Sequence, residues 1–251
     1  MALKARGVIR RSKLPAPARR VLLKLSGEML GGAAGRGLDD RGLGAIAEQI
    51  AGAREAGAEV AVVIGGGNIL RGGAGGGPTL PRTTLDTLGM LGTLMNALAL
   101  QGALAARGLP ARVLSAIEAP QAAERYTPER GRECLARGEV VLCAGGTGHP
   151  FFTTDTAAAL RALELDCTLL VKGTKVDGVY SADPVHHPRA RRFAQLSFAQ
   201  VLRRRLGVMD LTAITLCMEY RLPVVVLNAA EPGSIRAYLR GELRGTLIRP
   251  A

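Results

Sequence analysis

The sequence contains no tryptophan, and aromatic residues of all kinds make up only 3% of its 251 residues. Because 47% of the chain is nevertheless hydrophobic, the core must be built from leucine, valine, isoleucine and alanine. This is enough apolar material for one large core, and the length suits a single α/β domain. We expect that domain to span residues 21–251, after a short tail.

Long apolar runs and paired cysteines are also absent. No continuous apolar run reaches the roughly 18 residues that span a bilayer, and the N-terminal segment lacks the apolar stretch of a secretory signal. The cysteines show no CxxC or Cys/His metal spacing, and they are far apart at Cys134, Cys143, Cys167 and Cys217. These absences argue against a membrane protein, a disulfide and a zinc site, and they predict a cytoplasmic protein.

Acidic residues are missing from the first twenty positions, which hold seven lysines and arginines. The whole chain has a formal net charge of +12, so this tail supplies more than half of the excess. We interpret the tail, residues 1–20, as a disordered, solubilising extension. Contact with nucleic acid through its positive charge is the alternative interpretation.

Apolar runs typical of strands alternate with helical patterns along the rest of the chain. Buried strands separated by helices indicate a three-layer αβα sandwich with a mostly parallel central sheet, here of about eight strands. The predicted strands are 21–25, 59–64, 111–117, 140–144, 167–171, 223–227 and 246–249. The predicted helices are 40–56, 86–107, 128–137, 155–164, 197–206, 210–221 and 233–240.

A lysine lies at the end of two of these strands. Lys24 lies in the first strand, and Lys172 directly follows the strand at 167–171. A lysine within a buried sheet is unfavourable unless an anion meets its ammonium group. One such lysine is equally explained by a side chain that reaches solvent from an edge strand, but two in one sheet favour a polyphosphate site.

Glycine-rich turns follow two other strands. Gly65 to Asn68 follow the strand at 59–64, and the segment from Gly145 to Asp155 leads into a helix. Glycines let backbone N–H groups approach an anion closely, and helix starts attract phosphate. Arg71 adds a forked donor for phosphate. Because ligands bind beyond the carboxyl ends of parallel strands, we expect the turns and lysines to form one site.

Two common nucleotide-binding patterns are absent: the P-loop sequence GxxxxGK[ST], and the HRD and DFG signatures of protein kinases. The chain instead resembles the amino-acid-kinase superfamily, and within it the family of bacterial uridylate (UMP) kinases. The resemblance rests on KLSGE (24–28), VVIGGGNILRG (62–72), LDTLGMLGTLMN (85–96), GTGHPFFTTD (146–155), KGTKVDGVYSADP (172–184) and VMDLTA (208–213).

The resemblance implies an enzyme that transfers a phosphoryl group from ATP, with Mg²⁺, to UMP. It implies ATP-binding residues at Lys24, Leu25, Ser26, Gly27, Gly67, Arg71, Thr174, Tyr180 and Asp183. The catalytic residues would be Lys24, Lys172, Asp155 and Arg71.

The same resemblance implies a UMP site. Its residues would be Gly66, Asp86, Thr147, Gly148, His149, Pro150, Phe151, Phe152, Thr153 and Thr154. Asp86 suits a ribose, because a carboxylate accepts hydrogen bonds from both hydroxyls of a cis diol. Capping the long helix is its alternative role, and the two roles are compatible. We expect one of the two phenylalanines to pack beneath the loop.

A nucleotide phosphate has a second pKa of about 6, so the acceptor is already an anion at pH 7 and needs no general base. Catalysis is then electrostatic. Lys24, Lys172, Arg71 and Mg²⁺ would neutralise the phosphates. Asp155 would orient a lysine or the metal.

Some positions depart from the family pattern, namely Leu85, His149 and Gly173. None of these changes removes a charge, so we expect activity to survive. Gln101 and Ala105 stand where many GTP-activated relatives carry basic or imidazole side chains, which predicts weak activation by GTP. The resemblance further implies a homohexamer and inhibition by UTP.

Two other functions remain open at this point. One is a kinase of the same fold that acts on a carboxylate or an amino acid, for which Asp86 would repel the substrate. The other is a nucleotide-sensing or nucleic-acid-binding regulator, which would use the basic tail but would not need both strand-end lysines.

Overall fold

The computed structural model describes residues 20–70, 80–183, 186–187, 189–242 and 244–250. The predictions for the basic tail up to residue 19 and for Arg71 in the glycine-rich segment lie outside the described residues. Almost all of the other predicted elements and site residues can be located.

A single sheet of nine strands runs through the described part of the chain, in the order β4-β3-β5-β2-β1-β6-β8-β9-β7. Its neighbouring strands pair in parallel except for β8 and β9, which are antiparallel. The strands are β1 (Arg20–Leu25), β2 (Glu59–Ile64), β3 (Ala111–Ser115), β4 (Glu124–Arg125), β5 (Val140–Ala144), β6 (Leu169–Thr174), β7 (Gln195–Ser197), β8 (Val224–Asn228) and β9 (Thr246–Arg249).

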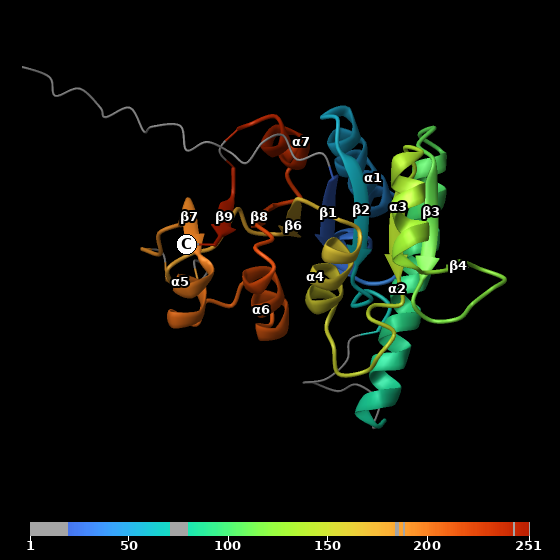
Figure 1. The fold of residues 1–251 in the computed structure, drawn as a ribbon, viewed down its shortest axis with the longest axis horizontal. Helices are drawn as coiled ribbons and strands as arrows, with labels where there is room; N and C mark the ends of the chain where they lie inside the picture. Colours follow the sequence, from blue (N-terminus) through green and yellow to red (C-terminus); the bar gives the residue numbers. More distant parts are fainter. Residues whose placement is uncertain (1–19, 71–79, 184–185, 188, 243, 251) are drawn as a thin grey trace, which may run out of the picture.

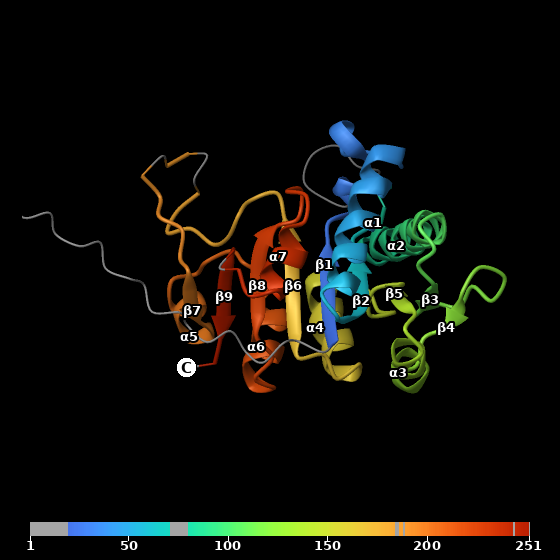
Figure 2. The same cartoon turned by 90° about the horizontal axis from the view of Figure 1, so that it is seen from above.

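Helices cover both faces of this sheet (Figures 1 and 2), which gives the predicted three-layer αβα arrangement. One layer holds α1, α2 and α7, and the other holds α3, α4, α5 and α6. The helices are α1 (Asp40–Glu55), α2 (Arg82–Ala105), α3 (Pro128–Ala136), α4 (Thr154–Glu164), α5 (Phe198–Arg203), α6 (Leu211–Glu219) and α7 (Ser234–Leu239), with short 3₁₀ turns η1 (Gly27–Met29) and η2 (Gly32–Ala34).

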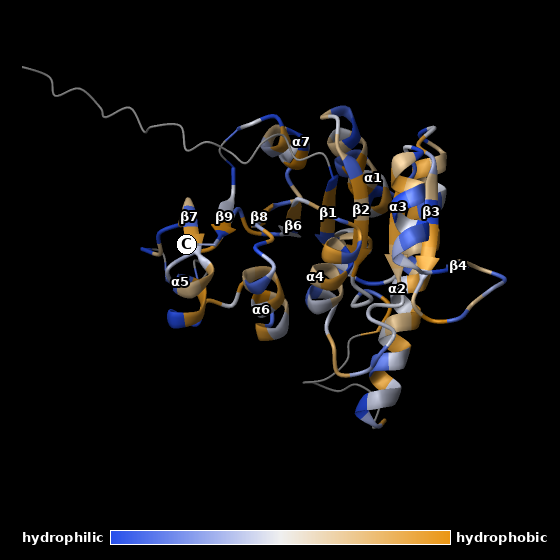
Figure 3. Ribbon diagram, in the orientation of Figure 1, coloured by the Kyte–Doolittle hydropathy of each residue, from blue (hydrophilic) through white to orange (hydrophobic). Residues whose placement is uncertain are grey.

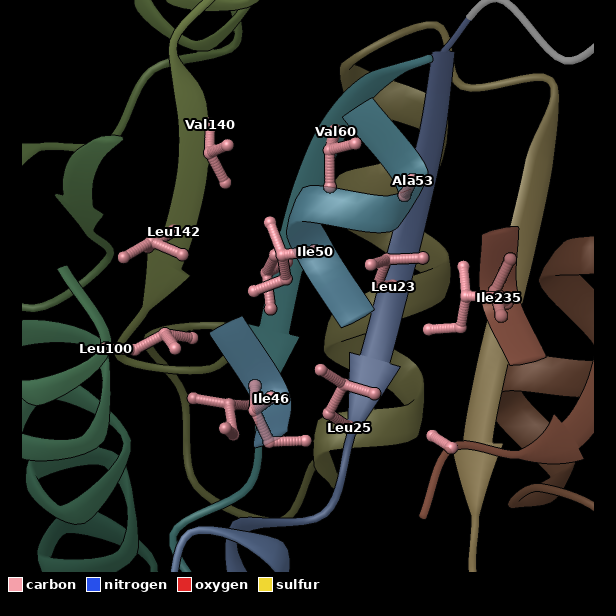
Figure 4. Close-up of a cluster of buried hydrophobic side chains, with 14 of the residues drawn as sticks. Leu23, Leu25, Ile46, Ile50, Ala53, Val60, Leu100, Val140, Leu142 and Ile235 are labelled. Atoms are coloured by element: carbon pink, nitrogen blue, oxygen red, sulfur yellow. The ribbon is translucent and has the colours of Figure 1, made fainter. Parts of the chain in front are cut away.

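The sheet separates two aliphatic cores, because successive residues of a strand point to opposite faces. In β1, Leu23 and Leu25 pack against α1 and its neighbours (Figure 4). Leu22 faces the opposite layer, where it packs with α4. The central strands are therefore hydrophobic along their length, whereas the helices carry polar residues on their outer faces (Figure 3).

Helix α2 is the one described helix that is long and apolar enough, by length and composition, to cross a membrane. Polar residues interrupt its apolar ones, so no continuous apolar run marks it in the sequence. In its most apolar stretch, 39% of the residues are buried inside the protein, and the helix packs against α1, β3 and β5. A core helix of a soluble protein has the same properties.

The structure differs from the sequence prediction in several elements, of which β4, β7, β6 and α2 matter most. The short strands β4 and β7 were not predicted, so the sheet has nine strands rather than about eight. Strand β6 continues to Thr174, which places Lys172 inside the strand. Helix α2 begins at Arg82 with Pro81 as its N-cap, so the alternative role of Asp86 as the cap of this helix is wrong.

Candidate active site

Two lysines lie side by side on the α4 face of the sheet. Strands β1 and β6 are parallel neighbours, and their register pairs Lys24 with Lys172. Leu22 and Leu170 occupy the preceding paired positions on the same face and pack into the α4 core. The alternation that buries these leucines therefore directs both lysines toward the same helix.

Asp155, in the first turn of α4, lies between the two ammonium groups. One carboxylate oxygen is 2.9 Å from Nζ of Lys24, and the other accepts a hydrogen bond of 2.7 Å from Nζ of Lys172. Each of the three side chains is 13–14% exposed. One carboxylate thus holds two cations at fixed positions, an arrangement that needs little reorganisation when an anion binds.

Lys172 is the more strongly constrained of the two lysines. Its ammonium also donates to the carbonyl of Val208, between α5 and α6. Burial lowers the pKa of Lys172 below its ordinary value of 10.5, and the nearby charge of Lys24 lowers it further, against the opposing effect of Asp155. Burial and Lys24 destabilise the charged form of the Lys172 side chain, whereas Asp155 stabilises it.

The position of Asp155 depends on the start of α4. The Thr153 hydroxyl caps the helix by accepting hydrogen bonds from the N–H groups of Asp155 and Thr156. The hydroxyls of Thr153 and Thr156 in turn donate to the carboxylate of Asp210, which also caps α6 through Ala213 N–H.

No role was predicted for Asp210, although it lies in the VMDLTA motif. An aspartate directly before an apolar helical run is a recognisable N-cap signal. Its second role, as a tether between α6 and the start of α4, depends on tertiary contacts that the sequence pattern does not contain.

Glycine-rich turns allow two strand ends to approach each other. A Cβ atom at Gly27 would lie 2.1 Å from the carbonyl oxygen of Gly65, so only glycine fits there. A Cβ atom at Gly66 would similarly lie 2.5 Å from the carbonyl oxygen of Gly89 on α2. The turn that follows Leu25 at the end of β1, beginning with Ser26, therefore packs directly on the turn after β2.

A pocket lies between these turns, α2 and the loop after β5. The predicted residues that line it are Gly66, Gly67, Asp86, Thr147, His149, Phe152, Thr153 and Thr154. Of these, Gly67 was predicted for ATP and the others for UMP. Leu70, Leu85, Gly89, Met90 and Thr93 also line the pocket, without having been predicted as binding residues. Asp86, Gly89, Met90 and Thr93 have the i, i+3, i+4, i+7 spacing of one helix face, which was the available signal.

Asp86 connects α2 to the acceptor loop, residues 145–153. Both carboxylate oxygens accept hydrogen bonds from Nε of Arg82, at 2.8 and 2.9 Å, and one also accepts from Phe151 N–H at 2.8 Å. Burial would raise the pKa of Asp86, but the hydrogen bonds from Phe151 and Arg82 outweigh it and lower the pKa below 3.8. The carboxylate therefore remains an acceptor at neutral pH.

Gly148, Pro150 and Phe151 do not line this pocket. Phe151 is 65% exposed and Phe152 is 50% exposed, so the expectation that one of them packs beneath the loop is wrong. Phe151 contributes its backbone N–H to Asp86 instead. The loop is held by polar contacts and glycine turns rather than by an aromatic anchor.

A second pocket lies beside Lys172, between the end of β6 and the α5–α6 connection. Thr174, Tyr180 and Asp183 line it, as do residues of the α5–α6 connection, including Arg204 and Arg205. Thr174 Oγ1 donates to the carbonyl of Val176 at 2.7 Å. Residues predicted for the two nucleotides thus line two separate pockets, with Lys172 at the edge of one and the start of α4 at the edge of the other.

Metal binding by side chains alone is not indicated in the part of the chain that the structure describes. It contains no group of three or more His, Cys, Asp or Glu side chains that could hold a metal ion. Both oxygens of Asp155 lie close to lysine ammonium groups, and one of them, Oδ1, has no hydrogen-bond partner among the described residues. Mg²⁺ commonly enters kinase sites bound to nucleotide phosphates and water.

Comparison with known sequences shows clear similarity along most of the chain. The model of the Amino acid kinase family matches residues 19–228. A protein named uridylate kinase from Bradyrhizobium diazoefficiens is 50% identical over 230 residues, which cover 92% of this chain and 97% of the relative. A uridylate kinase from Methylococcus capsulatus is 48% identical over 230 residues, covering 92% of this chain and 96% of the relative.

Solved structures agree with this similarity. The crystal structure of UMP kinase from Bacillus anthracis superposes with a TM-score of 0.88 at 37% identity, covering 93% of this chain and 97% of that protein. The structure of UMP kinase from Ureaplasma parvum gives a TM-score of 0.84 at 32% identity, covering 92% and 99% of the two chains.

Proposed function

Because the chain belongs to the amino acid kinase family, we propose that it is an ATP-dependent nucleoside monophosphate kinase that converts UMP to UDP. The named relatives cover almost the whole chain at about half identity, and all of them are uridylate kinases. The solved neighbours are UMP kinases as well. A kinase of the same fold that acts on a carboxylate or an amino acid is not favoured.

The observation that carries the mechanism is the Lys24–Asp155–Lys172 cluster between the two pockets. UMP would bind in the pocket lined by Gly66, Asp86 and the acceptor loop. ATP would bind on the opposite side, along the turn after β1 and the pocket that includes Lys172. Their phosphates would then meet in line at the two ammonium groups.

The chain's own groups act mainly by positioning charge. The UMP phosphate is already an anion near pH 7, so no side chain has to remove a proton from it. Lys24 and Lys172 would stabilise the negative charge on the transferring group, and Asp155 would keep both of them in place. Mg²⁺ would arrive with ATP and neutralise charge between the donor phosphates.

Three further features belong to this proposal. We expect a homohexamer, by resemblance to the family, and a cytoplasmic location. UTP should inhibit by competing with UMP, because it carries the same uridine. These properties are independent of the phosphoryl-transfer step. Mass measurement in solution tests the hexamer, cell fractionation tests the location, and initial-velocity kinetics test inhibition by UTP.

A coupled assay of ADP release with UMP, CMP, AMP and GMP as acceptors tests the function directly. UMP should be converted much faster than the other three, and conversion should require Mg²⁺. Equal rates with AMP or GMP would remove the specificity for uridylate but leave phosphoryl transfer intact. Turnover of an acidic metabolite instead of any nucleotide would favour the carboxylate kinase.

A further inference from the structure

A buried arginine lies on α4, six residues after Asp155. Only 6% of the Arg161 side chain is exposed, and its helix neighbours Ala157, Ala158 and Ala162 are fully buried. A guanidinium group inside an apolar layer is strongly unfavourable unless its N–H groups are paired. The role of this buried arginine can therefore be inferred from the groups that its guanidinium contacts.

Arg161 contacts one group on its own helix and two from elsewhere in the chain, while its Nε has no hydrogen-bond partner in the part of the chain that the structure describes. Its Nη1 donates to the carboxylate of Glu164 at 2.6 Å, and its Nη2 donates to the carbonyl of Gly146 at 3.2 Å. Its guanidinium carbon lies 4.0 Å from the ring centre of Tyr126, whose hydroxyl donates to the same Glu164 carboxylate at 2.8 Å. Glu164 and Tyr126 compensate the buried charge, whereas Gly146 belongs to the acceptor loop.

The acceptor loop needs such support because its backbone is unusual. Gly145, Gly146 and Gly148 have φ values of 76°, 59° and 84°, and Phe151 has a φ of 71°. Glycine adopts this left-handed conformation easily but does not enforce it. The far end of the loop is fixed by Thr153, the cap of α4. The near end is held by Thr93 of α2, whose hydroxyl accepts a hydrogen bond from Gly145 N–H at 2.9 Å, and at the next carbonyl by Arg161.

The contact with Gly146 also sets the direction of the next N–H group. In a planar trans peptide the carbonyl and the N–H point in opposite directions. The carbonyl of Gly146 points toward Arg161, so the N–H of Thr147 points away from it. Gly146 and Thr147 both line the pocket assigned to the acceptor nucleotide.

We infer that Arg161 is a positioning residue for the acceptor nucleotide: its bond to the Gly146 carbonyl orients the Gly146–Thr147 peptide so that the pocket presents a backbone donor. The inference rests on the proposed function. Arg161 does not contact the reacting atoms, and it acts on acceptor binding through the loop rather than on the two lysines.

Steady-state kinetics of Arg161→Lys test this role. Lysine keeps the charge beside Glu164 but replaces two donor nitrogens with one. We expect the KM for UMP to rise about tenfold, the effect of losing one hydrogen bond to a charged group. The KM for ATP should change by less than about twofold. Tyr126→Phe is the matched control, because it removes a contact to Glu164 and leaves the Gly146 bond; its KM for UMP should stay near that of the wild type.

Hydrogen exchange of the acceptor-loop amides supplies a readout that does not depend on activity. Residues 145–149 should exchange faster in Arg161→Lys than in the wild type or Tyr126→Phe, without nucleotide. If the lysine variant does not fold, Arg161→Met combined with Glu164→Leu replaces the pair by apolar side chains, which buried sites tolerate better than a lone charge.

Two results would overturn the inference: unchanged loop exchange, or equal increases in KM for ATP and UMP. A wild type that phosphorylates none of the nucleotides would contradict the proposed function instead. In that case the exchange comparison would still decide whether Arg161 positions the loop.

Discussion

Among single residues, Lys24 and Lys172 are the ones on which the proposed chemistry most depends. Replacing either with alanine should lower kcat by roughly 100-fold or more, because their charges act mainly on the transferring phosphoryl group. Asp155→Asn should keep the fold and lose most of the rate. Initial velocities at saturating ATP and UMP, with urea unfolding as the test of folding, measure both effects. Normal turnover by either lysine variant would contradict the electrostatic mechanism.

The buried position of Lys172 predicts an effect of alkaline pH. Burial lowers its pKa below 10.5, so between the folded value and 10.5 the unfolded chain binds more protons than the folded one. Stability should therefore rise with pH in that window, as the penalty for the buried charge disappears. Activity should fall over the same window, because the ammonium is lost.

Lys172→Arg separates this titration from other alkaline effects. A guanidinium stays charged above pH 12, so the alkaline decline in kcat should move to higher pH or vanish in this variant. The pH profile of kcat for the wild type and the variant gives the comparison. An identical alkaline limb in both proteins would show that another group titrates.

At this scale the sequence singled out charged residues that the structure brings together, but it did not show their geometry. The cost of burying a lysine pointed to Lys24 and Lys172, yet only the β1–β6 register shows that they are neighbours on one face of the sheet. The predicted cap role of Asp86 failed because α2 begins earlier, at Arg82. The contact of Asp86 with Phe151 N–H joins positions 65 residues apart, which no local pattern reveals.

At the scale of secondary-structure elements, Asp210 ties α6 to the start of α4. Replacing it with alanine should lower the free energy of unfolding by about 2–3 kcal/mol, since a helix cap and two hydroxyl bonds to a carboxylate are lost together. Asp39→Ala is the matched control, because Asp39 caps only α1, through Gly42 N–H at 2.9 Å. This substitution should lower the free energy of unfolding by about 1 kcal/mol. If urea unfolding gave the same loss of unfolding free energy for Asp210→Ala and Asp39→Ala, the bonds from Asp210 to the start of α4 would contribute nothing to stability.

The Asp210 effect should also depend on pH. Burial would raise its pKa, but hydrogen bonds from Thr153, Ala213 and Thr156 outweigh it and lower the pKa below 3.8. Its stabilising contribution is then present above pH 3.8 and is lost as the pH falls through the lower folded value. Unfolding measured from pH 6 downward should show the wild type and Asp210→Ala converging only at acid pH.

Most elements were predictable because their apolar patterns are long. The strands β1, β2 and β5 and the helices α1 and α4 lie within a residue or two of their predicted bounds. Strands β4 and β7 were not predicted, since they have two and three residues, with the sequences ER and QLS. Such short segments become strands because a strand from elsewhere in the same chain, β3 or β9, lies beside them and pairs with them. This is a tertiary effect that the local sequence does not show.

At the scale of the whole molecule, the basic tail should be separable from catalysis. Deleting residues 1–18 should leave kcat and KM nearly unchanged, because no site motif lies in the tail. The deletion should weaken retention on heparin or random DNA, most clearly at low salt. Loss of activity in a folded deletion variant would show that the tail reaches the active site or a subunit contact.

Regulation by GTP gives a second test at this scale. The cavity at the end of α2 is lined by Gln101, Ala105 and Arg112, among others. The Gln101 amide donates to the carbonyl of Ala111 at 2.9 Å, and Arg112 pairs with Glu139 at 3.1 Å. Because these polar groups are already engaged, GTP should activate weakly or not at all. Strong activation in initial-velocity assays would mean that Arg112 exchanges Glu139 for the nucleotide.

The order of strands in the sheet has a consequence for how the protein is made. Strand β9, at residues 246–249, lies between β8 and β7, so β7 has no described partner in the sheet until the ribosome has synthesised the later segment. The α5–α6 connection, whose Val208 carbonyl accepts a hydrogen bond from Lys172, follows directly from β7 and α5. The pocket proposed for UMP is lined only by residues up to Thr154, and its loop contact Arg161 follows soon after, although the tether from Asp210 to Thr153 is made later. The pocket proposed for ATP is lined by residues as late as Val226, so it is completed later during translation.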